Sequence, residues 1–133
     1  MKQAVEVHFK MDISDGTEIE YYSLGDYHVY EDHKELEFTE ELEAKVRTNI
    51  YIYPNRVFVK RSGDITMEQE FIEGQITNMH LTTNFGLEVS MSTSTNLIQF
   101  EDHTLTIIYE TEVGETNKRY HKLVVKYTFV QNQ

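Results

Sequence analysis

The feature that most constrains the fold of this chain is a two-residue alternation of apolar and polar side chains along most of its length. In the N-terminal segment, the apolar residues of this pattern are Val5, Val7, Phe9 and Met11. Successive side chains of a β-strand point to opposite faces, so a pattern of this kind is typical of a strand with one buried face. Residues 5–12 are therefore predicted to form a half-buried strand.

Similar segments recur about every ten residues, the spacing expected of an antiparallel sandwich or barrel. Turn-forming pairs separate them, among them Asp15-Gly16, which suits a tight hairpin, and Pro54-Asn55. Short connections favour an up-and-down meander, and closing it removes exposed sheet edges. We predict an all-β fold in which residues 1–133 form one domain, a single antiparallel, mostly up-and-down barrel of about 8–10 strands with little helix.

One segment, residues 37–49, also fits a helix. Thr39 would cap its start, and Leu42 and Val46 would share one face at a spacing of four residues. We favour strands here because the sequences on both sides continue the two-residue period.

The charge of the chain argues against several classes of partner. Twelve basic and twenty-three acidic residues give a net charge of −11. Nucleic-acid binding needs clustered Lys and Arg, and anionic membranes repel such a protein, so we expect neither partner. The charge favours solubility, with an acidic face for a basic partner as the alternative.

The cellular location is predicted from the cysteine content and the N-terminus. The chain has no cysteine, which fits a reducing compartment and rules out disulfides and thiol chemistry. Its first twelve residues alternate in polarity and lack the apolar run of a signal peptide. We expect a cytoplasmic protein. The spacing of the six histidines predicts no metal site, and no cofactor-binding motif is present.

Polar residues interrupt the apolar rows that should face the barrel interior. This set comprises Glu40, Thr48, Arg61, Gln69, Thr83, Thr93 and Tyr109. A charge inside a barrel is costly unless it is paired and hydrogen-bonded. Arg61 therefore needs a carboxylate, and Glu40 is the acidic residue at an apolar position of a nearby strand. We predict that the two form an internal ion pair.

Three blocks of the sequence resemble, in order, those of the YwiB-like family of uncharacterised bacterial proteins. They are "VFVKRSGDITMEQEFIEG", "TTNFGLEVSMSTSTNLIQF" and "LTIIYETEVGE". The chain differs from the family pattern at Leu81 and Asn84, where a tyrosine and a proline are expected. The resemblance implies a calycin-like barrel of the lipocalin and fatty-acid-binding type, with no established activity. The chain has no tryptophan and so lacks the Gly-x-Trp motif of true lipocalins.

The leading hypothesis is that the barrel binds a small, partly apolar, anionic ligand. The expected ligand-binding residues are Glu40, Arg61, Gln69, Thr83, Thr93 and Tyr109. An arginine suits this role because its planar guanidinium can bind both oxygens of a carboxylate. The first alternative is a scaffold with a filled core and a purely structural Glu40–Arg61 pair, and the second is a calycin-type enzyme of unknown substrate.

A homodimer is also predicted, because several apolar side chains should face outward. These are Tyr22, Tyr51, Ile108, Val124 and Val130.

Overall fold

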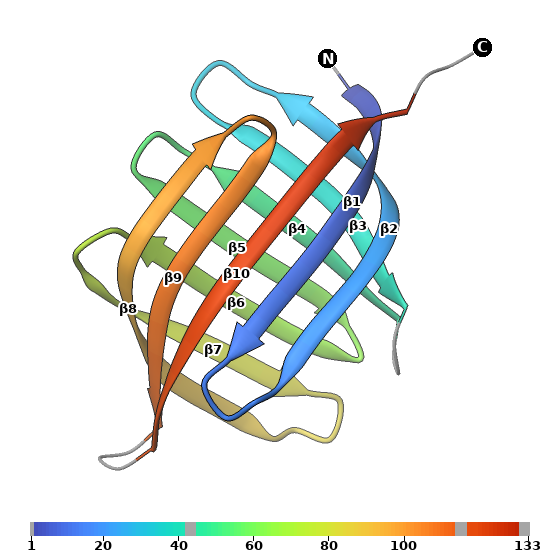
Figure 1. Cartoon of the computed structure of the whole chain (residues 1–133). Coiled ribbons are helices and arrows are strands. Elements are labelled where there is room, and N and C mark those ends of the chain that lie inside the picture. The colour runs from blue at the N-terminus through green and yellow to red at the C-terminus, as the bar shows by residue number, and fades with distance from the viewer. Residues whose placement is uncertain (1, 42–44, 114–116, 131–133) are drawn as a thin grey trace.

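The computed structural model of the protein describes residues 2–41, 45–113 and 117–130. These residues form ten β-strands (Figure 1). The strands are β1 (Lys2–Ile13), β2 (Glu18–Val29), β3 (Lys34–Glu41), β4 (Lys45–Ile52), β5 (Arg56–Gly63), β6 (Ile65–Ile72), β7 (Ile76–Thr83), β8 (Glu88–Glu101), β9 (Thr104–Val113) and β10 (Asn117–Phe129). The described residues include no helix, and so none that could cross a bilayer.

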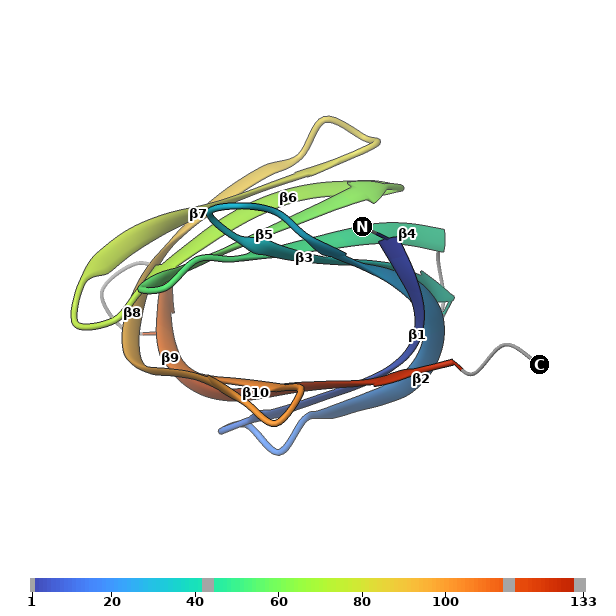
Figure 2. The ribbon, with the colours of Figure 1, turned by 90° about the horizontal axis from the view of Figure 1, so that it is seen from above.

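The strands close into one barrel, which Figure 2 shows as a ring. Each strand pairs antiparallel with the next one in the sequence, and β1 pairs with β10 to complete the ring. This confirms the predicted antiparallel barrel. The alternative helix over residues 37–49 is wrong where the structure describes it, because these residues continue β3 and β4; residues 42–44 lie outside the described residues.

Apolar side chains fill the half of the barrel next to the chain termini. The fully buried members of this core include Val5, Val7, Leu36, Leu105 and Val125. They alternate with outward residues along their strands, as the two-residue period requires. The interior of this half is therefore an apolar core.

Strands β2 and β3 pair along only part of their length. Their described backbone ladder runs from Val29–Lys34 to Gly25–Phe38. Gly25 permits this close approach, since a Cβ there would lie 2.3 Å from the carbonyl oxygen of Glu37. Beyond it, the Ser23 hydroxyl donates to the carbonyl of Thr39 (2.7 Å). Side chains thus continue the contact between the two strands where the ladder ends.

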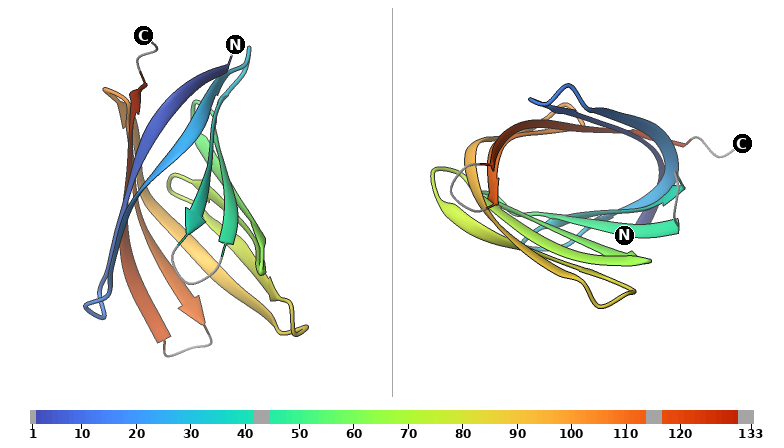
Figure 3. Two further views of the ribbon diagram at one scale, coloured as in Figure 1. Left: turned by 90° about the vertical axis from the view of Figure 1, so that its right-hand side faces the viewer. Right: turned by 90° about the horizontal axis from the view of Figure 1, so that it is seen from below.

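The β7–β8 hairpin leans away from the rest of the barrel (Figure 3). The alternation of Val89, Met91 and Thr93, continued backwards in steps of two, predicts that Leu87 and Phe85 also face the interior, and for these two residues the prediction is wrong. Phe85 is 98% exposed and Leu87 61% exposed, because both lie in the turn before β8 begins at Glu88. The inner row of β10, continued from Leu123 in steps of two, also predicts an inward Phe129, but this side chain is exposed.

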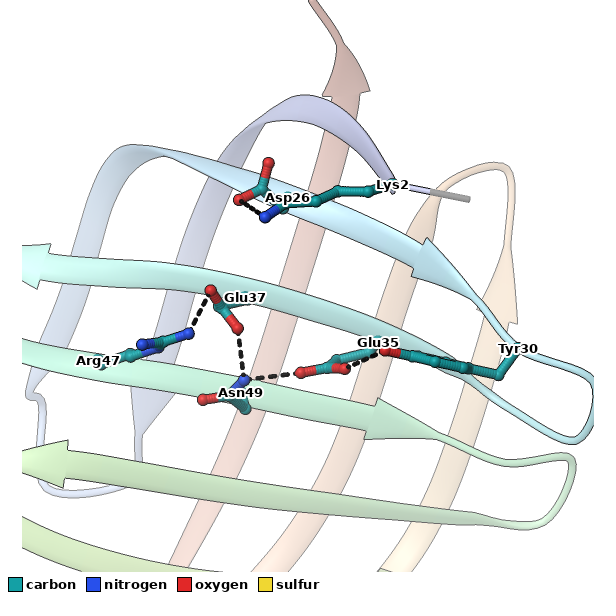
Figure 4. Close-up of polar contacts among 7 residues, drawn as sticks. All are labelled: Lys2, Asp26, Tyr30, Glu35, Glu37, Arg47 and Asn49. Atoms are coloured by element: carbon teal, nitrogen blue, oxygen red, sulfur yellow. Dashed lines mark hydrogen bonds and ion pairs between the residues drawn. The ribbon is translucent and has the colours of Figure 1, made fainter.

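A polar network ties β3 to β4 on the outer face of the barrel (Figure 4). The side-chain amide of Asn49 donates to Glu35 (2.7 Å) and to Glu37 (3.1 Å). Arg47 forms an ion pair with Glu37 at 2.6 Å, while Tyr30 donates to Glu35 at 3.4 Å. Glu35 is only 7% exposed although it lies on the outer face, so its carboxylate depends on these donors.

Candidate functional site

A cavity of about 420 Å³ occupies the half of the barrel away from the termini. All ten strands contribute to its lining, since each directs alternate side chains inward. The apolar lining consists of Phe9, Met11, Ile19, Ile50, Val59, Met67, Phe71, Met79, Met91 and Leu123. The polar lining consists of Glu40, Thr48, Arg61, Gln69, Tyr109, Thr111, Arg119 and His121.

Glu40 and Arg61 form the predicted ion pair at the edge of this cavity. The Nε of Arg61 donates to Oε2 of Glu40 at 3.1 Å, and its Nη2 contacts the same oxygen. The side chain of Glu40 is 7% exposed and that of Arg61 is 27% exposed. The prediction of an internal pair is confirmed, with the arginine on the more open side.

The second oxygen of Glu40 binds a tyrosine. The Tyr21 hydroxyl donates to Oε1 of Glu40 at 2.5 Å. Burial raises the pKa of Tyr21 far above its usual range, and the neighbouring Glu40 carboxylate raises it further. Tyr21 therefore keeps its proton at all ordinary pH values and acts as a permanent donor to Glu40.

Two further predicted residues, Gln69 and Tyr109, line the cavity, and a third, Thr93, is a hydrogen-bond partner of Gln69. Gln69 lines the cavity and donates to the hydroxyl of Thr93 at 3.0 Å, while Thr93 itself is fully buried behind it. Tyr109 lines the cavity, where its ring packs edge-on against Phe71. Burial raises the pKa of Tyr109, so its hydroxyl also stays protonated.

Thr83 lies away from the other predicted site residues. It ends β7, and its hydroxyl accepts a hydrogen bond from the backbone N–H of Leu87 at 3.2 Å. It stabilises the turn of the hairpin and does not belong to the cavity lining. The alternation gives the face of a residue but not the point where a hairpin leaves the barrel.

Three polar lining residues were missed by sequence reasoning: Thr111, Arg119 and His121. His121 shares a hydrogen bond with Thr111 (2.8 Å) and stacks on Tyr109 with the ring planes 2° apart. The signal was present, because steps of two lead from Tyr109 to Thr111 on β9 and from Leu123 back to His121 and Arg119 on β10.

The described lining of the cavity is positively charged, whereas the whole chain is negatively charged. Its described residues include two guanidinium groups, Arg61 and Arg119, and one carboxylate, Glu40. Burial and the nearby Arg119 lower the pKa of His121, so its imidazole is neutral at neutral pH. The lining therefore has an excess positive charge within a protein of net charge −11. This arrangement suits an anion with an apolar part.

A closed ten-stranded antiparallel barrel with a part-polar cavity places the chain among the small all-β barrel proteins. Residues 5–125 match the family described as "Domain of unknown function (DUF1934)", and the chain belongs to this family. The uncharacterized β-barrel protein YwiB of Bacillus subtilis (strain 168) is 32% identical over 137 aligned positions, and the alignment covers 96% of each chain.

The crystal structure of the YwiB protein from Bacillus subtilis has a similar fold. It matches with a TM-score of 0.86 at 28% sequence identity, over 98% of this chain and 94% of the other. The resemblance seen in the sequence blocks is thus confirmed for the family and for the barrel. The relative is itself described as uncharacterized, so the comparison leaves the function to be argued from the cavity.

Proposed function

We propose that the barrel binds a small, partly apolar, anionic ligand in its cavity. The observation that carries this proposal is the cavity of about 420 Å³, which is lined by apolar and polar side chains and has the Glu40–Arg61 pair at its edge. Ligand sites in proteins have this composition and start at about 300 Å³. The proposal keeps the calycin-like class and the cytoplasmic location, both of which rest on the sequence.

The state of the barrel interior favours binding over the scaffold alternative. A scaffold needs no internal space, and empty volume in a core lowers stability. The Glu40–Arg61 pair also lies against this space instead of being enclosed by packed side chains. The cavity and the ion pair that borders it are both expected of a protein that binds and releases a ligand.

Native mass spectrometry of the protein purified from its own host tests the proposal. We expect a co-purifying small molecule that is lost when Met91→Trp fills the cavity. The control is Ile76→Trp, because Ile76 is exposed on β7 and the larger ring there leaves the cavity unchanged. A wild-type protein without any bound molecule, or binding that survives Met91→Trp unchanged, would count against the proposal.

A further inference from the structure

We propose that Arg119, at the mouth of the cavity, holds the anionic group of the ligand, and that the apolar part of the ligand points inward. This inference rests on the proposed function and gives the bound ligand a direction. The mouth is the end of the barrel formed by the turns at residues 14–17, 64 and 84–87. Arg119 lines the cavity close to this end, and its side chain is 59% exposed.

Arg61 is the less suitable anchor because Glu40 already neutralises it. Both the Nε and the Nη2 of Arg61 contact the same oxygen of Glu40. A ligand carboxylate at Arg61 would therefore lie beside a second carboxylate, and like charges at such distances repel strongly in a partly buried site. Glu40 is also held in place by Tyr21, so it cannot easily move aside.

Among the residues that the structure describes, Arg119 has a loose carboxylate partner. Its Nη1 lies 3.8 Å from Oδ2 of Asp15, which belongs to the β1–β2 turn and is itself 39% exposed. Exposed ion pairs of this length contribute little stability, so a ligand carboxylate can replace Asp15 at small cost. The planar guanidinium of Arg119 would then bind both oxygens of the ligand.

The groups behind Arg119 change from polar to apolar along β10. His121 follows on the same row, neutral and hydrogen-bonded to Thr111, and Leu123 comes next. On β6, β7 and β8 the lining includes three methionine side chains, Met67, Met79 and Met91. Methionine adapts to varied apolar shapes, so this region suits a flexible chain. From the mouth inward, the cavity thus presents first a charge, then hydrogen-bonding groups and then apolar surface. This order matches an amphiphile with one anionic head.

Calorimetric titration with octanoate and with uncharged octanol tests the inference. We expect the wild-type protein to bind octanoate about tenfold more tightly than octanol, since a hydrogen bond to a charged group has this effect. Arg119→Gln should abolish this preference by weakening octanoate binding to the level of octanol, whereas Asp15→Asn should strengthen octanoate binding. Arg47→Gln, which removes a cation on the outer face, is the control and should change neither affinity.

Two results would overturn the inference in different ways. If Arg119→Gln keeps the preference for octanoate and the double variant Glu40→Gln/Arg61→Gln loses it, the anchor is Arg61 and the proposed function stands. If the wild-type protein binds neither octanoate nor octanol, and 1-anilinonaphthalene-8-sulfonate also fails to bind, the proposed function fails together with the inference. Thermal unfolding of each variant verifies that it is folded before titration.

Discussion

The Nε of Arg61 on β5 lies 3.1 Å from Oε2 of Glu40 on β3, so the pair reaches across the intervening strand β4. The curvature of the closed sheet brings inward side chains of such strands closer together, which favours this contact. The pair thus connects strands that share no backbone ladder. It accounts for an arginine within an otherwise apolar row.

Arg61→Ala leaves the buried carboxylate of Glu40 without its cation. We expect a loss of about 2–3 kcal/mol in the free energy of unfolding, between the values for exposed and fully buried pairs, because the cavity gives water some access. Glu40→Leu/Arg61→Met should be milder, since no charge is stranded. Chemical denaturation of the single and double variants measures both effects. Small, additive losses at the two positions would show that the pair has no energetic coupling.

His121 should make the stability of the barrel depend on pH. Its pKa in the folded protein is lowered, first by burial and then by Arg119, so the unfolded chain takes up a proton at a higher pH. Stability is therefore complete above the ordinary histidine pKa of about 6.5 and falls as the pH drops from there through the lowered native value.

The variant His121→Gln should lose less stability than the wild type over this pH range. Nuclear magnetic resonance titration of the imidazole gives the native pKa directly. A midpoint for His121 at or above the ordinary value would contradict the environment described for it.

Asn49 is predicted to be sensitive to the addition of a charge. Its amide donates to both Glu35 and Glu37, so Asn49→Asp removes both hydrogen bonds and places a third carboxylate between two others. We expect a loss of about 2–3 kcal/mol near neutral pH, because Glu35 keeps only the longer bond from Tyr30 among its described donors and the new carboxylate repels both glutamates. Part of this loss should disappear in acid, where the carboxylates are protonated.

The control for this substitution is Asn78→Asp, which adds the same charge at an exposed position on β7. Urea denaturation at two pH values distinguishes the sites. Equal losses for the two variants would show that the outer network around Asn49 has no special role.

Gly25 should tolerate no side chain. A Cβ there would meet the backbone oxygen of Glu37 at 2.3 Å, so Gly25→Ala must push β2 and β3 apart. Overpacking of this kind costs about 1–3 kcal/mol, and here the obstacle is backbone. Gly16→Ala is the comparison, because nothing lies within 4 Å of a Cβ there and only its φ of +92° opposes the change. Similar unfolding midpoints for the two variants would argue against the close approach at Gly25.

Much of the barrel could be predicted because each strand carries its own alternating pattern. The sequence placed Glu40 and Arg61 correctly since both stand out against apolar rows. It missed Arg119 and His121, because the row that begins at the apolar Leu123 becomes polar at these two positions and no longer stands out as an inner face. The cavity itself depends on how ten strands pack together, and no single segment encodes that space. The homodimer stays a prediction.

The central claim is that the cavity of this barrel binds an anionic amphiphile, and a crystal structure of the protein with octanoate tests it most directly. We predict density for the hydrocarbon chain between Phe71 and Met91, with the carboxylate within hydrogen-bond distance of Arg119. An empty cavity at saturating octanoate, or octanoate bound only on the outer surface of the barrel, would contradict the claim.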